Sequence, residues 1–222
     1  MTETKAAMNP IQAVLWDFGG VVTTSPFEAF RRFEQARGLP QDFLRRVNST
    51  NIHTNAWAKM ERGEIGPDEF DALFREESTA LGHPVDGRDV LPLLSGDVRP
   101  QVVSAIRQIR GRYRVACLTN NMSAGHGPAM ARTQERADAI AEVMGLFEVV
   151  VESSKTGLRK PEPGFYLKAC ELLGIEPAAA VFLDDLGVNL KPAAALGMRT
   201  IKVGDPDVAL SELGELIGMK LV

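Results

Sequence analysis

The amino-acid sequence predicts an α/β protein in which a parallel, Rossmann-like sheet is flanked by helices and a helical segment is inserted after the first strand. Short apolar runs alternate with helical patterns over the second half of the chain. The long segment that follows the first apolar run has helical patterns only. Repeated strand–helix units imply right-handed crossovers and therefore a parallel sheet.

The first half of the chain contains one expected strand, which is followed by helices. Residues 11–16 are a short continuous apolar run, as in a buried parallel strand. From about Pro26 to Leu94 the spacing is helical, and this segment has little room to join the sheet. The helices expected within it cover residues 27–36, 41–47, 55–62 and 67–81. We therefore expect a core domain of residues 10–24 and 95–222, and a helical cap domain of residues 25–94.

Alternation of the two patterns resumes in the second half. The expected strands cover residues 113–119, 147–151, 179–183 and 199–203. The expected helices cover residues 98–109, 128–144, 163–173, 190–196 and 208–216. In the helix 190–196 we expect Asn189 as the N-cap, which places Pro192 in the first turn, where proline is tolerated.

Composition and charge narrow the class of protein. The chain has 222 residues, 45% of them hydrophobic and 24% charged, which suits one globular α/β domain with an insertion. A net charge of −4 does not favour nucleic acid as a partner. No apolar run approaches the ~20 residues of a membrane span, and the polar residues 1–9 are expected to form a frayed tail rather than a secretion signal. Cys117 and Cys170 lie in apolar patterns, so we expect buried, reduced thiols in a cytoplasmic protein.

Polar residues suited to phosphate or metal stand at the ends of three expected strands and in one loop. They are Asp17, the pair Thr119 and Asn120, the pair Asp184 and Asp185, and the loop residue Lys160. In an α/β sheet the ligand binds beyond the carboxyl ends of the strands, so these residues should converge on one crevice. A carboxylate nucleophile, a hydroxyl, a cation and a carboxylate pair together indicate metal-assisted phosphoryl transfer.

The order of these motifs resembles that of the haloacid dehalogenase superfamily of hydrolases. Within that superfamily the chain is most similar to the phosphatase-like domains at the start of soluble epoxide hydrolases and of some multidomain acyl-CoA dehydrogenases. The resemblance covers the core well and the helical insertion loosely. It is carried by the sequences KPEP at 160–163, FLDDLGVNLK at 182–191 and LGMRTI at 196–201.

The resemblance implies a phosphatase whose nucleophile is Asp17, which would form an aspartyl-phosphate that water then hydrolyses. Thr119 and Asn120 would bind the transferring phosphate oxygens with hydroxyl and amide donors. Lys160 would balance the charge of nucleophile and phosphate, and the Pro161 that follows distinguishes it from other cations nearby. Each residue alone also has an ordinary structural interpretation, as a strand-end or turn residue or a solvated lysine.

The resemblance also implies a Mg²⁺ site. Asp17, the carbonyl of Gly19, Asp184 and Asp185 would hold the ion, which prefers hard oxygen ligands. In most relatives a second aspartate, the general acid and base, stands where this chain has Gly19. Loss of a positioned acid–base group typically slows a reaction ~10²–10⁴-fold. Leaving groups that need little protonation should therefore be favoured.

Three functions compete at this point. The first is a Mg²⁺-dependent phosphatase that acts on a small phosphorylated metabolite. The second is a carbon–halogen hydrolase, which uses an aspartate nucleophile without metal, and the pair Asp184 and Asp185 argues against it. The third is a slow or non-catalytic module that binds a phosphorylated ligand. We do not expect epoxide hydrolysis, because the chain ends where the second catalytic domain of those relatives would begin.

The cap is the part that would select the substrate, and it carries the fewest motifs. Asn51, His53 and Asn55 are candidates for the substrate mouth, because loops of a cap often set specificity. His53 and His126 match no family motif and are expected in solvated positions rather than as bases. Trp57 and Phe70 are expected to pack inside the cap. The sequence gives no indication of the oligomeric state.

Overall fold

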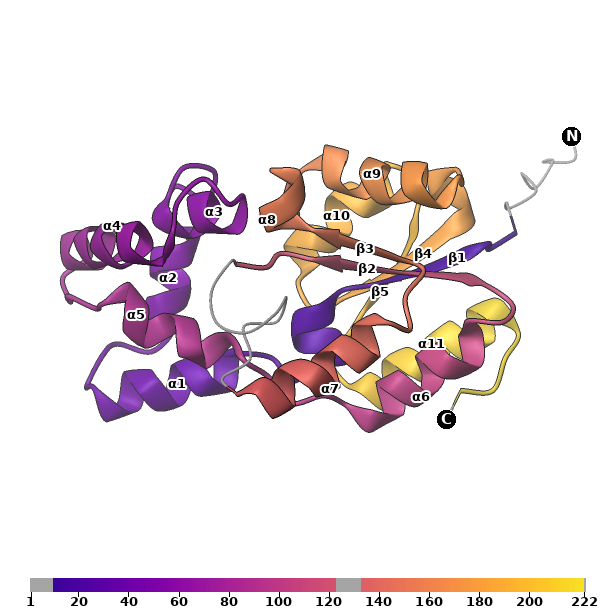
Figure 1. Ribbon diagram of the computed structural model, residues 1–222, viewed down its shortest axis with the longest axis horizontal. Coiled ribbons are helices and arrows are strands. Elements are labelled where there is room, and N and C mark those ends of the chain that lie inside the picture. The colour runs from indigo at the N-terminus through magenta and orange to yellow at the C-terminus, as the bar shows by residue number, and fades with distance from the viewer. Residues whose placement is uncertain (1–9, 123–132, 222) are drawn as a thin grey trace, which may run out of the picture.

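The computed structural model describes residues 10–122 and 133–221, which form a five-stranded sheet beside a lobe of helices (Figure 1). The strands are β1 (Ala13–Trp16), β2 (Arg114–Thr119), β3 (Val149–Glu152), β4 (Ala180–Asp184) and β5 (Arg199–Lys202). They lie in the order β3-β2-β1-β4-β5, and every neighbouring pair is parallel. The predicted parallel α/β architecture is therefore confirmed.

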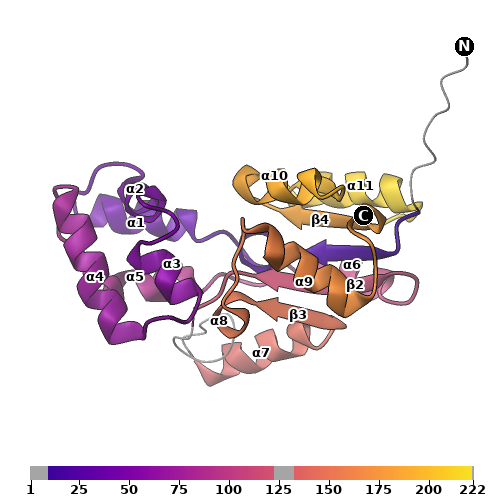
Figure 2. The ribbon, with the colours of Figure 1, turned by 90° about the horizontal axis from the view of Figure 1, so that it is seen from above.

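Helices cover both faces of the sheet (Figures 1 and 2). One face packs against α6 (Pro100–Ile109), α7 (Gln134–Met144) and α11 (Pro206–Ile217), and the other against α9 (Pro163–Leu173) and α10 (Gly187–Ala195). Side chains of β1 alternate between these two cores: Val14 and Trp16 belong to the first, Ala13 and Leu15 to the second. The strand is buried on both faces, which explains its continuous apolar sequence.

The helical lobe has a hydrophobic core of its own. It contains α1 (Phe27–Ala36), α2 (Phe43–Ser49), α3 (Ala56–Glu61), α4 (Pro67–Ala80), α5 (Gly87–Val90) and the 3₁₀ turn η2 (Leu91–Leu94). The rings of Trp57 and Phe70 lie 6.0 Å apart inside it, as predicted. Buried Glu34 accepts hydrogen bonds from the amides of Asp42 and Leu44 at the start of α2. Such carboxylates satisfy amide donors that a helix leaves unpaired at its beginning.

Two short linkers join this lobe to the sheet, and they run side by side. The Thr24 amide donates to the Asp97 carbonyl at 2.8 Å, and the Arg99 amide donates to the Val22 carbonyl at 2.9 Å. The insertion therefore begins and ends at one place beyond β1. We propose residues 25–94 as the cap and residues 10–24 and 95–222 as the core.

The predicted start of one helix was wrong. α10 begins at Gly187, a turn earlier than expected, so Asn189 lies inside the helix and Pro192 is past its first turn. The residue before the helix is Leu186, whose amide donates to the Asp184 side chain at 2.8 Å. Asn189 donates to both oxygens of Asp184 at 3.0 Å. The short helical turns η1 (Phe18–Val22), α8 (Ser153–Thr156) and η3 (Pro177–Ala179) were not predicted, and neither were α5 and η2.

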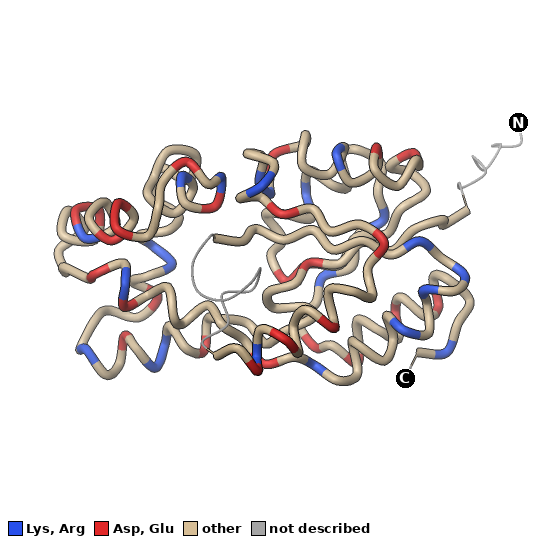
Figure 3. The backbone as a smooth tube through the Cα atoms, viewed as in Figure 1, with Lys and Arg blue, Asp and Glu red and all other residues tan. Residues whose placement is uncertain are grey.

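Some expectations concern residues outside the described ranges. The expected tail at residues 1–9 and His126 belong to them, as does the first part of the helix expected at 128–144. Both Cys117 and Cys170 are buried free thiols, as predicted. Within the described ranges, no helix combines the length and apolarity needed to cross a bilayer. Acidic and basic residues are interspersed over both lobes (Figure 3).

Candidate active site

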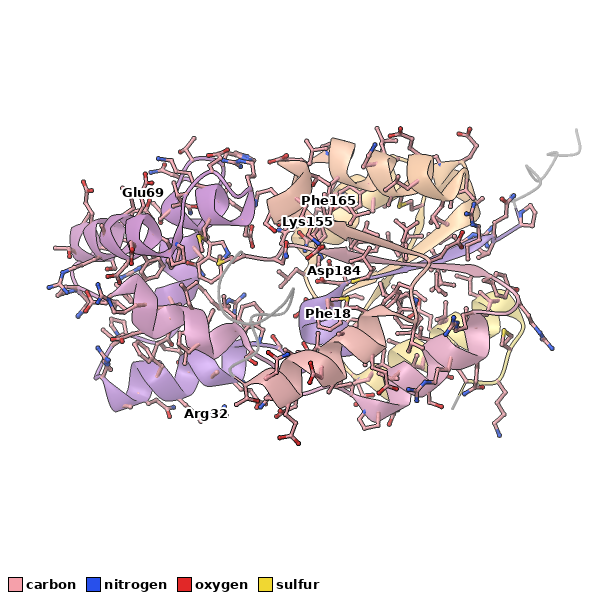
Figure 4. All side chains as sticks on the ribbon, viewed as in Figure 1. Phe18, Arg32, Glu69, Lys155, Phe165 and Asp184 are labelled. Carbon is pink, nitrogen blue, oxygen red and sulfur yellow. The ribbon has the colours of Figure 1, made fainter. Side chains whose placement is uncertain are left out.

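The carboxyl ends of β1 and β4 bring two carboxylates to one buried lysine. Asp17 directly follows β1, and Asp184 is the last residue of β4. The Lys160 Nζ lies 2.6 Å from Asp17 Oδ1 and 2.9 Å from Asp184 Oδ2, and its side chain is only 1% exposed. Figure 4 shows Asp184 at the edge of the sheet that faces the helical lobe. The predicted convergence of these three residues is therefore present in the structure.

The neighbouring cations are engaged elsewhere. Lys155 is largely exposed and forms an ion pair with Glu152. Arg159 turns toward the helical lobe, where it pairs with Glu61 of α3 at 2.5 Å. Of these three cations, only Lys160 pairs with Asp17 and Asp184.

The end of β2 holds the loop that carries Lys160. The Asn120 Nδ2 donates to the Lys160 carbonyl at 2.9 Å, and the Lys160 amide donates to Asn120 Oδ1 at 2.8 Å. The Asn120 side chain therefore positions the backbone of the lysine. Thr119 is 5% exposed and lines the cavity beside it.

The two adjacent aspartates have different surroundings. Asp184 is fully buried and accepts hydrogen bonds from Lys160, the Leu186 amide and Asn189. Among the described residues, Asp185 accepts one long contact from a side chain, the Ser25 hydroxyl at 3.5 Å. The carboxylate of Asp185 thus retains more capacity to bind a ligand. Oxygens of Asp17, Asp184 and Asp185 lie within 4.8 Å of one another, a spacing that suits one metal ion.

Two glycines shape the turn after Asp17. Gly20 has φ +85°, and a Cβ there would collide with the Asp185 carboxylate, so a side chain is excluded on both counts. Gly19 has φ −71° and ψ 125°, which any residue can adopt. A Cβ at Gly19 would meet no atom within 4 Å. The position that usually carries the second aspartate is therefore open in space.

Burial and charge crowding govern protonation at this site. Burial raises the pKa of Asp17 well above its usual value, and the carboxylates of Asp184 and Asp185 add to this, whereas Lys160 opposes it. Burial, reinforced by the charge of Asp184, raises the pKa of Asp185 to about 6. Burial lowers the pKa of Lys160, but the two carboxylates beside it outweigh that effect and raise it. Three carboxylates and one ammonium leave two negative charges uncompensated, which one divalent cation would balance.

A cavity of about 330 Å³ lies over these residues, between the sheet and the helical lobe. Its floor is polar and includes Asp17, Thr119, Lys160 and Asp185. Its roof is mostly apolar and is formed by Phe27, Phe30, Ile52, Trp57 and Leu94. Arg45, Asn48 and Ser49 of α2 add polar groups to the wall. The cavity therefore combines a charged end with an apolar chamber.

The three residues predicted for the substrate mouth do not line this cavity. Asn51 and His53 are exposed, and Asn55 is buried as the N-cap of α3. The Asn55 side chain accepts from the Ala58 amide at 2.8 Å and donates to two carbonyls of the preceding turn. The assignment to the substrate mouth stays a prediction, and Asn55 shows that capping chemistry and ligand-binding chemistry use the same residue types. Glu61 also lines the cavity and was not expected there from the sequence, since a glutamate on a polar helix is usually solvated.

Comparison with known proteins identifies the family. The family model for haloacid dehalogenase-like hydrolases matches residues 11–197. The chain belongs to this hydrolase family. The predicted resemblance is thereby confirmed, and the five strands and the residues at their ends fall within the matched region or directly after it.

Relatives of this haloacid dehalogenase-like hydrolase include proteins with further domains. Acyl-CoA dehydrogenase family member 10 of Mus musculus is 33% identical over 95% of this chain and 19% of its own length. Bifunctional epoxide hydrolase 2 of Mus musculus is 29% identical over 94% of this chain and 39% of its own length. The chain thus spans less than half of either relative. A sesquiterpene phosphatase of Aspergillus oryzae is 25% identical over 76% of this chain and 83% of its own length.

A solved structure shares the fold. A haloacid dehalogenase-family enzyme of Bacteroides thetaiotaomicron, in complex with magnesium and inorganic phosphate, superposes with a TM-score of 0.59. It is 22% identical in sequence and covers 88% of this chain and 96% of its own. The match at this identity shows a shared fold.

Charge crowding at the site gives a first prediction, about stability. In chelated protein at pH 8, Asp185→Asn should raise the free energy of unfolding by about 1–3 kcal/mol, because it removes a buried charge beside Asp184. Ionised Asp185 destabilises the folded state. This destabilisation should grow as the pH rises from the ordinary pKa of an aspartate to about 6, and it should be complete above pH 6. Thermal unfolding in EDTA at pH 4 and pH 8 measures it. Exposed Asp68→Asn is the control, and a destabilised Asp185→Asn at pH 8 would contradict the account.

Proposed function

We propose that this chain is a Mg²⁺-dependent phosphatase that hydrolyses a small phosphorylated metabolite through an aspartyl-phosphate on Asp17. The observation that carries the proposal is the Lys160 ammonium held between Asp17 and Asp184, with the less engaged carboxylate of Asp185 alongside. The phosphatase relative from Aspergillus oryzae and the neighbour with bound magnesium and phosphate support it.

The residues present fit a magnesium ion. The donor set consists of hard carboxylate oxygens, and the two uncompensated negative charges match a divalent cation. Asp17, Asp185 and the Gly19 carbonyl would hold the ion, while Asp184, which already accepts several hydrogen bonds, supports the site. Bound there, the ion would draw negative charge from the phosphoryl oxygens.

In the proposed reaction an Asp17 oxygen attacks phosphorus, and the bond from phosphorus to the ester oxygen breaks. The ester oxygen leaves with its electron pair and takes up a proton from solvent or from the substrate itself. Lys160 compensates negative charge near the reacting group, and the Thr119 hydroxyl with the Asn120 backbone amide binds phosphoryl oxygens. Water then attacks phosphorus, which releases inorganic phosphate and regenerates the Asp17 carboxylate.

One observation favours a second function. Gly19 supplies no acid to the leaving group, so a module that binds a phosphorylated ligand and turns it over slowly fits the same residues. The carbon–halogen hydrolase is the least favoured alternative, because the pair Asp184 and Asp185 has no use in that metal-free chemistry. Release of phosphate in excess of enzyme distinguishes the phosphatase from the binding module.

The nucleophile assignment predicts the effect of Asp17→Asn. This change should lower kcat for 4-nitrophenyl phosphate by about 10⁴-fold or more, because no oxygen remains that can form the covalent intermediate. It should also abolish trapping of beryllium fluoride, which mimics the phosphoryl group on a carboxylate. Exposed Asp68→Asn is the matched control. Undiminished turnover in Asp17→Asn would eliminate this mechanism.

The metal assignment predicts dependence on Mg²⁺. Exhaustive chelation should remove hydrolysis, and added Mg²⁺ should restore it, because the site then regains its charge balance. Asp185→Asn should weaken the activation by Mg²⁺ without lowering the unfolding temperature in chelator, whereas Asp184→Asn should lower that temperature as well, since Asp184 has the structural contacts. Titration of activity and of unfolding temperature against Mg²⁺ tests both statements. Full activity in chelator would speak against the phosphatase.

The open space at Gly19 predicts a gain of function. In the unmodified protein, the logarithm of the rate should fall steeply with leaving-group pKa, because an alkoxide leaves poorly without a proton. Gly19→Asp should raise hydrolysis of simple alkyl phosphates by about 10²-fold and of aryl phosphates much less. Gly19→Asn has nearly the same shape without the acid and should give no gain. A flat dependence with chemistry shown to be rate-limiting in single turnovers would mean that another residue supplies the proton.

A further inference from the structure

The Glu61 carboxylate lies at the boundary between the helical lobe and the sheet domain and joins three parts of the cavity wall. Its Oε2 accepts hydrogen bonds from Arg159 at 2.5 Å and from Asn120 Nδ2 at 3.2 Å. Its Oε1 accepts from the Trp57 indole at 3.0 Å. Trp57 belongs to the roof of the cavity, Asn120 follows strand β2, and Arg159 lies in the loop that carries Lys160. One side chain of the cap thus contacts the cavity roof, the end of β2 and this loop.

Arg159 also reaches a second point of the cap. Its Nη1 donates to the Ile52 carbonyl at 3.0 Å, while Nε and Nη2 face Glu61. The planar guanidinium therefore bridges the loop before α3 and the end of α3 itself, a geometry that the single ammonium of a lysine cannot reproduce. The side chains of Arg159 and Glu61 are only 7% and 8% exposed.

These contacts continue into the site of the proposed reaction. The Asn120 Nδ2 that donates to Glu61 also donates to the Lys160 carbonyl, and Asn120 Oδ1 accepts the Lys160 amide. Lys160 in turn places its Nζ against Asp17. A continuous series of hydrogen bonds therefore runs from the cap helix α3 to the nucleophile.

The Glu61 carboxylate is held by three donors. Burial raises the pKa of Glu61 above its usual value, whereas the hydrogen bonds that it accepts from Arg159, Asn120 and Trp57 favour its ionised form. A buried ion pair is also weak evidence for stabilisation, since removing two charges from water costs about as much as their attraction returns. The placement of this pair therefore calls for a function beyond stability.

We propose that Glu61 and Arg159 are a positioning pair, which seats the cap over the cavity and holds Asn120 and the Lys160 loop in the reactive arrangement. The assignment rests on the proposed phosphatase function for its kinetic consequence. Misplacement of reacting groups by about 1 Å can cost ~10²-fold in rate. Loss of the pair should therefore act on kcat, although neither residue takes part in bond making.

The test uses Glu61→Gln, Arg159→Met and the double variant, with Glu34→Gln as the matched control. Glu34 is a buried carboxylate of the same lobe, bonded within it to amides at the start of α2. Each single variant at the pair should lower the unfolding temperature, because an unpaired charge stays buried, and should lower kcat for 4-nitrophenyl phosphate by about 10- to 100-fold. The double variant should recover the unfolding temperature, since no orphan charge remains, but not kcat.

Amide hydrogen exchange supplies a readout that does not depend on turnover. Exchange at residues 158–162 should become faster in all three variants of the pair, and it should be unchanged in Glu34→Gln. Recovery of kcat together with stability in the double variant would reduce the pair to a structural role and overturn the proposal. Unchanged exchange at residues 158–162 would also overturn it. A native protein that hydrolyses no phosphate ester would refute the phosphatase function, and the exchange result would still decide whether the pair holds the loop.

Discussion

The burial of the Lys160 ammonium is the constraint on which the arrangement of the site depends. A lysine that is 1% exposed must be paired, because an isolated buried charge is far less stable than one in water. Asp17 and Asp184 supply the pairing from the ends of two adjacent parallel strands, and Asn120 fixes the lysine backbone from the end of a third. Two ion pairs and the hydrogen bonds of Asn120 therefore fasten one loop to three strand ends. The position of Asp17 follows from the sheet itself.

The neighbouring carboxylates Asp184 and Asp185 divide two tasks between them. Asp184 accepts hydrogen bonds from a lysine, a backbone amide and Asn189, and it thereby fixes the start of α10. Asp185 projects into the space that Gly20 leaves free and keeps most of its acceptor capacity. Of two adjacent residues in one strand-to-helix turn, Asp184 thus anchors neighbouring groups and Asp185 keeps oxygens available to a ligand. The difference comes from the surroundings of each side chain.

The order of strands and helices, and the meeting of Asp17, Lys160 and Asp184, could be predicted because parallel strands end at one edge of a sheet and apolar runs mark those strands. The roles of Asn120 and Asn189 could not, since each depends on a partner brought near by folding. The capping role of Asn55 could not be predicted either, because a cap and a ligand-binding side chain look alike in sequence. Glu61 gave no signal, since only the contact between two lobes removes it from solvent.

The paired linkers beyond β1 have a consequence for how such proteins can change. Because Thr24 and Asp97 are hydrogen-bonded neighbours, the insertion is one closed excursion from a fixed point, and the entropy of closing such an excursion grows slowly with its length. Helices can therefore be gained, lost or exchanged there without altering the register of β1 against β2 and β4. Any segment that replaces these helices still meets the buried guanidinium of Arg159. It must therefore supply a hydrogen-bond acceptor to that group. The chamber over the site can thus change while the strand ends that carry Asp17 and Asp184 stay in place.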